Sequence, residues 1–334
     1  MKVLLTGGSG FIAAHCIDQL LERGHSVIFT VRSDEKGRKI LSNHSGVPLD
    51  KLNYVIVADI AKSTAFAEAV KSNPPFDAVV HTASPFHLGI NDPKDLLDPA
   101  INGTVGLLRA VKKSAPSVRR VVITSSFASM MNSAQHPMKY DETSWNPITS
   151  QEATLNAANA YRASKTFAEK AAWDFIRNGN PGFDIATINP PLVLGPVVSH
   201  LNSLDTINTS NQRLRDMIQG RCKDGLPPSF GVYLWADVRD VALAHVRAAE
   251  VSEAGGKRFL IAANTYVSNA HIAGIIRDQF PDLKNQLPME LDSDIPDDVY
   301  GYDNSRSTEV LNLEYRDLEE CVVDTVKSLL AVGS

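Results

Sequence analysis

The feature that most constrains this chain is a glycine-rich run near its start, Leu5-Thr6-Gly7-Gly8-Ser9-Gly10-Phe11-Ile12-Ala13. It follows an apolar segment that predicts a strand and opens an amphipathic segment that predicts a helix. Glycines here let the backbone turn sharply and approach a pyrophosphate, and the helix start supplies free N–H groups. The pattern alone is weak, but in the first strand–helix unit it favours a dinucleotide site over an ordinary turn. We expect Gly7, Gly10, Phe11 and Ile12 to contact the cofactor.

Strand and helix patterns then alternate along the chain as far as Pro190. The predicted strands are 2–6, 26–31, 53–57, 78–82, 120–124 and 184–189, and the predicted helices are 11–22, 34–41, 64–71, 99–113 and 154–175. This spacing predicts an α/β protein with a Rossmann-type, doubly wound parallel sheet and helices on both faces.

After Pro190-Pro191 the pattern becomes less regular. We expect a loop over 195–205, short strands at 232–235 and 257–262, and helices at 207–218, 238–249, 269–280 and 318–330. The main sheet is expected to be complete before these elements. We therefore divide the chain into a dinucleotide-binding domain, residues 1–190 plus parts of 230–265, and a smaller region, mainly 191–334, that is expected to bind substrate.

Composition narrows the classes of function. The 334 residues carry a net charge of −5, which gives no electrostatic reason to bind nucleic acid or an anionic membrane. Cys16, Cys222 and Cys321 lie far apart without metal-binding spacing, so we expect free thiols, no metal and a cytoplasmic location. No apolar stretch reaches the roughly 20 residues that a membrane helix needs.

The end of the second strand predicts which nicotinamide cofactor binds. An NAD-binding protein usually has an acidic residue there, whereas this chain has Arg32. A guanidinium forms paired hydrogen bonds to a 2′-phosphate, and Lys36 lies one helical turn further on. NADP(H) is therefore preferred, although Asp34 and Glu35 keep NAD open as an alternative.

Tyr161 and Lys165 are the candidate catalytic pair. An i, i+4 pair shares one helix face, so the phenol and the ammonium reach one cleft. We expect the ammonium to lower the pKa of the tyrosine, which then donates a proton as hydride reaches a carbonyl carbon. Ser126, just past the fifth strand, is expected to polarise the carbonyl oxygen, and Ser125 is the alternative.

With these parts in order, nearly the whole chain resembles the extended short-chain dehydrogenase/reductases. It is most similar to the branch of dihydroflavonol 4-reductase, cinnamoyl-CoA reductase and the yeast methylglyoxal/carbonyl reductases. The resemblance rests on the glycine loop and the Tyr161–Lys165 motif, and on further segments of the chain. These are 31–32, 58–60, 80–86, 102–104, 122–126, 189–196, 236–242 and 303–305.

The resemblance implies roles for further residues. Asp59 and Ile60 would flank the adenine, and Thr82, Ala83, Ser84 and Thr124 would line the cofactor site at the strand ends. Pro190 and Leu192 would hold the nicotinamide. Phe86, Phe127 and Met131 would face the substrate together with Ser126 and Tyr161, although core packing explains the aromatic residues equally well.

The expected function is NADPH-dependent reduction of a ketone or aldehyde to an alcohol by a monomer or homodimer. The signature of cinnamoyl-CoA reductases is missing after Lys165, which argues against CoA thioesters. The stretch 127–131 is largely apolar where the dihydroflavonol branch has polar residues, which favours a relaxed pocket for ketones or aldehydes. Two alternatives stay open. One is an NAD-dependent sugar-nucleotide epimerase or dehydratase, and the other is a non-catalytic NADP-sensing protein of the same fold.

Overall fold

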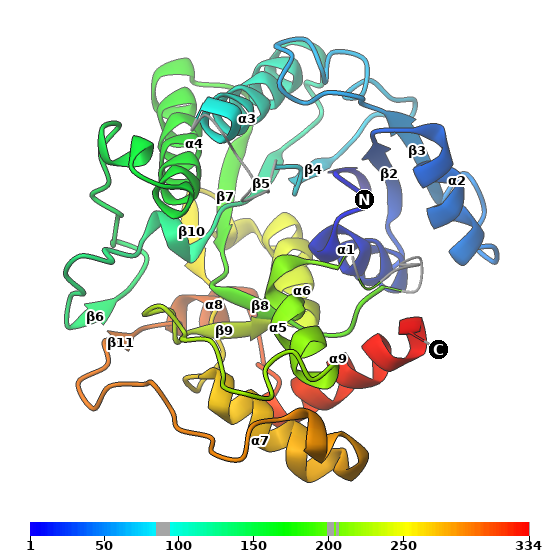
Figure 1. The fold of residues 1–334 in the computed structure, drawn as a ribbon. Coiled ribbons are helices and arrows are strands. Elements are labelled where there is room, and N and C mark those ends of the chain that lie inside the picture. The colour runs from blue at the N-terminus through cyan, green and yellow to red at the C-terminus, as the bar shows by residue number, and fades with distance from the viewer. Residues whose placement is uncertain (85–93, 199–203, 205–206, 334) are drawn as a thin grey trace.

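A seven-stranded sheet organises the computed structural model, which describes residues 1–84, 94–198, 204 and 207–333. Within these residues the strand order is β10-β7-β5-β4-β1-β2-β3 (Figure 1), and every pairing is parallel. The strands are β1 (Lys2–Thr6), β2 (Ser26–Val31), β3 (Leu52–Ile56), β4 (Ala78–His81), β5 (Arg120–Thr124), β7 (Asp184–Asn189) and β10 (Lys257–Leu260). The order reverses between β1 and β4, and ligands bind at such a point, outside the carboxyl ends of the strands.

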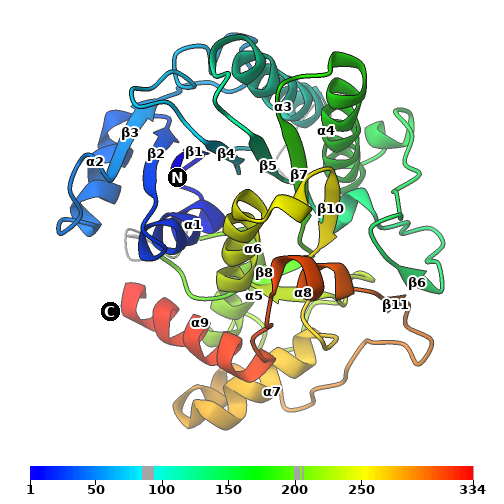
Figure 2. The ribbon, with the colours of Figure 1, turned by 180° about the vertical axis from the view of Figure 1, so that it is seen from behind.

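Helices cover both faces of the sheet, as Figure 2 shows from behind. The helices α1 (Phe11–Glu22) and α6 (Val238–Glu250) pack on one face, and α3 (Lys94–Ser114) and α4 (Ala157–Gly179) pack on the other. Within β1, Val3 and Leu5 join the core of the first face and Leu4 joins the second, and all three are fully buried. This alternation places apolar side chains in two cores at once and confirms the predicted fold class.

A smaller lobe packs beside the sheet and has its own core. The helices α5 (Thr209–Ile218), α7 (Asn269–Gln279) and α9 (Leu318–Gly333) surround a short parallel pair, β8 (Leu192–Leu194) and β9 (Trp235–Asp237). Trp235 is fully buried at the centre of this core, and its indole N–H donates to Thr265 Oγ1 at 3.2 Å. The lobe lies at the carboxyl edge of the main sheet, where it can close over a ligand (Figure 1).

The expectation that the main sheet is complete before Pro190 is wrong. β10 comes after β8, α5 and β9 of the lobe in the chain, yet it pairs with β7 through Lys257–Leu260 and forms the last strand of the main sheet. Leu260 and Phe259 are fully buried there. β10 covers the edge of β7, whose backbone N–H and C=O groups would otherwise lack partners. The residue limits of the two functional regions stay a prediction.

Other differences concern short segments. The helix predicted over 64–71 is wrong, because successive turns replace it, closed mainly by i→i−3 bonds such as Ala67 N to Thr64 O. These turns still bury Phe66 and Val70 against the sheet. The strand predicted at 232–235 begins only at Trp235. The pattern gave no sign of α8 (Ser305–Leu311), β6 (Lys139–Tyr140) or β11 (Gly301–Tyr302). In the part of the chain that the structure describes, no helix has the length and apolarity to cross a bilayer.

Candidate active site

The glycine loop has the backbone geometry that a phosphate site requires. Gly7 has a positive φ of 75°, and a Cβ there would lie 2.9 Å from the Cα of Ala83. Its N–H donates to Thr30 Oγ1 at 3.0 Å, which fixes the turn. Gly10 is the N-cap of α1 and brings no capping side chain, so the first N–H groups of the helix face outward. A phosphate bound there would accept from these groups and meet the positive end of the helix dipole.

A cleft of about 520 Å³ opens beside this loop at the carboxyl ends of the strands. Its walls come from α1, from the segments after β4, β5 and β7, from α4 and from α5. Thirteen of the residues predicted from the sequence line it, which brings the cofactor loop and the catalytic candidates into one site. They are Gly10, Phe11, Ile12, Thr82, Ser84, Thr124, Ser126, Phe127, Met131, Tyr161, Lys165, Pro190 and Leu192.

The cleft places Tyr161 next to Ser126. Burial raises the pKa of the Tyr161 phenol, and a hydrogen bond with the Ser126 hydroxyl opposes this only in part. The expectation that Lys165 lowers the pKa of Tyr161 is wrong in this structure, because the Lys165 ammonium lies 5.9 Å from the ring centroid and burial prevails. The phenol is therefore protonated at neutral pH, as a proton donor must be.

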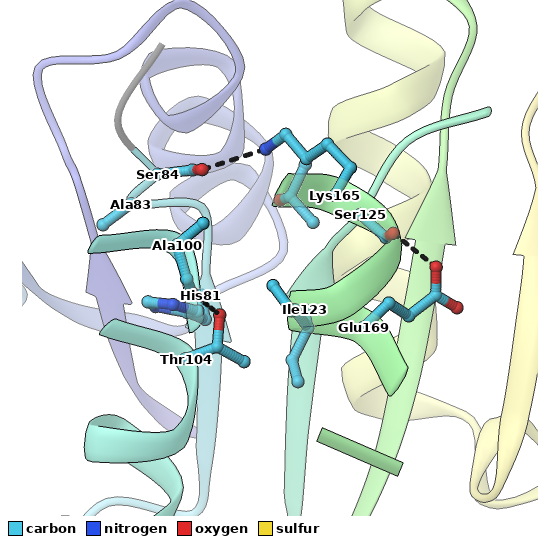
Figure 3. A pocket seen from close by; sticks show the side chains of 11 residues that line it. His81, Ala83, Ser84, Ala100, Thr104, Ile123, Ser125, Lys165 and Glu169 are labelled. Carbon is cyan, nitrogen blue, oxygen red and sulfur yellow. Dashed lines mark hydrogen bonds between the residues drawn. The ribbon is translucent and has the colours of Figure 1, made fainter. Parts of the chain in front are cut away.

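Lys165 extends from α4 toward the end of β4. Its Nζ donates to Ser84 Oγ at 3.0 Å, and burial lowers the pKa of its ammonium to about 8. A second cavity of about 20 Å³, large enough for one water, lies beside it, as Figure 3 shows. His81 lines that cavity, with Nδ1 2.7 Å from Thr6 Oγ1. Burial and the nearby ammonium lower the pKa of His81 to about 3, so it is a neutral structural residue.

The two serine candidates have different surroundings. Ser125 Oγ donates to the buried carboxylate of Glu169 at 2.5 Å, and both residues line the small cavity together with Ser84 (Figure 3). Ser126 Oγ accepts from Ala128 N at 3.1 Å and hydrogen bonds with Tyr161. Because Ser125 is held by a carboxylate and Ser126 by the tyrosine, the geometry favours Ser126 as the residue that receives a carbonyl oxygen.

Glu169 is the centre of a buried polar network that the sequence pattern did not reveal. It lies on α4 one turn beyond Lys165, and its Oε1 lies 2.6 Å from Arg258 Nε on β10. Ser129 donates to it at 2.6 Å and Asn189 at 2.8 Å. Burial opposes ionisation, but Arg258 and the hydroxyl donors prevail and hold the pKa of Glu169 below its usual value. The network ties the segment after β5 to α4 and β10.

Arg32 and Lys36 lie at the carboxyl end of β2 and on α2 (Asp34–Asn43), and both are exposed. Neither ion-pairs with a carboxylate among the described residues. Asp34, in contrast, accepts from the Tyr54 hydroxyl at 2.6 Å and pairs with Arg38 at 2.7 Å. Asp34, one of the two acidic side chains that could hold a ribose of NAD, is thus engaged, whereas the two cations remain available for a phosphate.

The remaining predicted positions lie outside the cleft lining. Gly7, within the glycine loop, packs against Ala83. Asp59 is exposed in the segment that follows β3, where its Oδ1 accepts from Ala61 N at 2.9 Å, and Ile60 packs near Gly103. Their contact with an adenine stays a prediction. Phe86 lies outside the described residues.

Phe127 and Met131 combine the two roles left open for them. Both line the cleft, and both are almost fully buried in a cluster of aromatic residues. The Phe127 ring meets Tyr140 edge to face with centroids 5.0 Å apart. The wall they form is apolar and well buried, which suits the hydrocarbon part of a small carbonyl compound.

Three further lining residues are not among those predicted from the sequence: Arg162, Arg213 and Phe230. Arg162 directly follows Tyr161, so its position beside the motif was the available signal. Arg213 lies on α5, where its side chain donates to Ser210 O and to Asn269 Oδ1. Phe230 is 78% exposed at the cleft and has a positive φ of 53°, which sequence patterns do not show for a phenylalanine.

Comparison with known proteins identifies a family, two relatives and one solved structure. A model of the NAD dependent epimerase/dehydratase family matches residues 3–262. The chain is 49% identical over 331 residues to ketoreductase azaE of Aspergillus niger, covering 98% of this chain and 97% of that protein. It is 36% identical over 341 residues to NADPH-dependent methylglyoxal reductase GRE2 of Saccharomyces cerevisiae, covering 99% and 98%. The crystal structure of yeast methylglyoxal/isovaleraldehyde reductase Gre2 complexed with NADPH superimposes with a TM-score of 0.93 at 33% identity, covering 100% and 99%.

Proposed function

The chain belongs to the NAD dependent epimerase/dehydratase family, and from this we propose that it is an NADPH-dependent carbonyl reductase that converts a ketone or aldehyde to an alcohol. One observation carries the proposal. Ser126, Tyr161 and Lys165 line the same cleft as the glycine loop. The ketoreductase and the NADPH-dependent reductase to which the chain is similar over almost its full length support the same activity.

The residues of the cleft fit a bound NADPH, which supplies the hydride. The N–H groups at the start of α1 would hold its pyrophosphate, and Arg32 and Lys36 its 2′-phosphate. Lys165 would donate to ribose hydroxyls. Pro190 and Leu192, which line the cleft after β7, would bound the nicotinamide.

Residues of the chain itself donate the proton that the reduction requires. Ser126 and Tyr161 lie close enough to share one hydrogen bond, so a carbonyl oxygen between them could accept from both hydroxyls. Both donors gain strength as negative charge builds on that oxygen, which lowers the barrier. Tyr161 releases its proton to the oxygen. The product is the alcohol.

Two alternatives have weaker support. A sugar-nucleotide epimerase on this fold would retain NAD tightly, whereas the engaged Asp34 and the available Arg32 favour NADP. A sensor without chemistry would have no need of a protonated tyrosine beside a serine at the cleft. A monomer or homodimer in the cytosol stays our prediction for assembly and location, supported for the location by three buried free thiols.

The direct test measures NADPH oxidation by the purified protein. Aldehydes, α-keto esters, aryl ketones and dihydroflavonols would be screened, with the alcohol product identified by chromatography. Reduction of at least one class without tightly bound NAD supports the reductase. Stoichiometric bound NAD with no net oxidation of NADPH would instead support the epimerase.

Arg32→Ala tests the cofactor preference. Losing a charged partner of the 2′-phosphate should raise the KM for NADPH by roughly tenfold or more, while the KM for NADH stays unchanged. Steady-state kinetics with both cofactors measure this. Lys51→Ala is the matched control, because Lys51 is an exposed cation directly before β3, at the amino ends of the strands and not at the carboxyl ends where Arg32 lies. Equal losses with NADH and NADPH in Arg32→Ala would show that Arg32 does not contact the 2′-phosphate.

We expect the Kd for NADPH to depend on pH through the protonation of Lys165. Its pKa of about 8 means that the ammonium loses its proton as the pH rises through that value. A neutral amine donates weaker hydrogen bonds, so the Kd for NADPH should rise about fivefold between roughly pH 7 and 9.5. Fluorescence titration measures this without turnover. In Lys165→Arg the guanidinium stays charged and the Kd should be flat over this range. The same rise in that variant would assign the titration to another group.

A further inference from the structure

The charged side chains that line the cleft are all basic among the described residues. Among the described residues that line it are Arg162, Lys165 and Arg213, and none is an aspartate or glutamate. Lys165 already has a partner in Ser84 and a proposed role toward the cofactor. The two arginines have no such role and stand on different elements, α4 and α5.

Arg213 is held in place by neutral groups. Its Nε donates to Ser210 O at 3.1 Å, and its Nη1 donates to Asn269 Oδ1 at 3.1 Å. Asn269 is itself 4% exposed and fixed through a bond from its Nδ2 to Pro227 O at 2.7 Å. Burial lowers the pKa of the Arg213 guanidinium, which nevertheless stays charged. Three of its five N–H donors take no part in these two bonds.

Arg162 is likewise held by a neutral group. Its Nη1 donates to the amide oxygen of Asn159 at 3.1 Å, and burial lowers the pKa of its guanidinium. The edge formed by Nε and Nη2 remains for a ligand. Within the described parts of the chain, no carboxylate forms an ion pair with Arg162 or Arg213.

Elsewhere the chain pairs its buried arginines with acids. Arg258 pairs with Glu169 and Arg120 with Asp184, both at 2.6 Å, and Arg239 pairs with Asp237 at 2.8 Å. Such pairing offsets the cost of taking a charge out of water. An arginine that is largely buried, rigidly held and left without a counter-charge at a cleft is therefore suited to an anionic ligand.

The cofactor phosphates do not account for Arg213. They are assigned to the start of α1 and to Arg32, whereas Arg213 contacts Asn269 at the start of α7, in the smaller lobe. Ser229 and Phe230, from the same lobe, line the cleft as well. An anion at Arg213 is thus expected on the substrate side.

Building on the proposed reductase function, we infer that the natural substrate is a carbonyl compound that carries a carboxylate. Arg213 and Arg162 bind the carboxylate, while Ser126 and Tyr161 receive the carbonyl oxygen. The apolar wall of Phe127 and Met131 contacts the carbon chain between the two groups. The planar guanidinium matches the two carboxylate oxygens with paired hydrogen bonds.

The test compares oxo acids with their methyl esters. A series in which the carbonyl is moved from position 2 to position 5 of the acid would be assayed for kcat/KM with NADPH. We expect at least one acid to exceed its ester by about tenfold or more, the effect of one charge-assisted pair. If the esters equal or exceed the acids throughout the series, the inference is wrong, although reduction of the esters would still support a reductase. Loss of both activities would instead argue against the proposed function.

Variants then assign the preference to a residue. In Arg213→Leu the ratio of kcat/KM for acid over ester should fall by about tenfold or more, and Arg213→Lys should retain part of it. Arg221→Leu, an exposed arginine near the end of α5 that pairs with Asp216, is the matched control and should keep the ratio. The Kd for NADPH is measured in each variant. A weaker Kd with an unchanged ratio in Arg213→Leu would place Arg213 at the cofactor and overturn the inference.

Discussion

Tyr161→Phe is expected to lower kcat for carbonyl reduction by roughly 10²- to 10⁴-fold, the usual contribution of a positioned general acid. The substitution removes one hydroxyl from a wall of the cleft and keeps the ring. It deletes both the proton donor and the hydrogen bond with Ser126. The glycine loop and Lys165 are untouched, so the Kd for NADPH should change little.

Stopped-flow measurement of NADPH oxidation, together with fluorescence titration of NADPH, separates these two effects. Tyr266→Phe is the matched control, since its hydroxyl donates to Tyr300 O at 2.6 Å and it does not line the cleft. Turnover near the wild-type value in Tyr161→Phe would exclude the proposed mechanism. A loss of turnover with intact binding would also exclude a sensor that needs no chemistry.

Glu169→Ala is expected to lower the free energy of unfolding by about 3–5 kcal/mol, because it leaves a buried arginine without its counter-charge. The Glu169 side chain is 1% exposed and that of Arg258 is 8% exposed. The substitution also releases the hydroxyls of Ser125 and Ser129, so the segment that carries Ser126 should lose its fixed position. Denaturant unfolding measures the first effect, and kcat at saturating substrate measures the second.

A surface ion pair of the same length provides the control. Lys71 Nζ lies 2.6 Å from Glu68, whose side chain is 85% exposed. Glu68→Ala should cost less than about 1 kcal/mol, since water screens exposed pairs. Replacing both buried partners, Glu169→Met with Arg258→Met, should recover much of the stability without restoring kcat. Equal losses from Glu169→Ala and Glu68→Ala would contradict the argument from burial.

Local patterns were sufficient for the parts of the fold that depend on local chemistry. The glycine loop, the alternating strands and helices and the Tyr161–Lys165 spacing all follow from residues close together in the chain. The choice between Ser126 and Ser125 is different, because it depends on the hydrogen bond between Ser125 and the distant Glu169, and Ser126 stays a prediction. The expected reductase class and the NADP cofactor agree with the relatives of the chain.

What the patterns missed depends on contacts between distant residues. Arg258 lies 89 positions from Glu169, and Arg213 lies 56 positions from Asn269. No periodicity links such pairs. The pKa of Tyr161 was misjudged for a related reason, because the i, i+4 spacing brings the ammonium near but says nothing of how deeply the phenol is buried.

The late position of β10 has a consequence for how the protein is made. When a ribosome has released the residues up to the end of β7, the sheet still lacks the strand that covers its edge. Arg258, the counter-charge of Glu169, is also still to come. Until nearly 70 further residues are synthesised, the edge of β7 therefore stays unpaired. During the same interval Glu169 lacks the arginine that pairs with it in the finished fold. A chaperone that shields strand edges would act in this interval, and slowing translation within 190–256 would lengthen it.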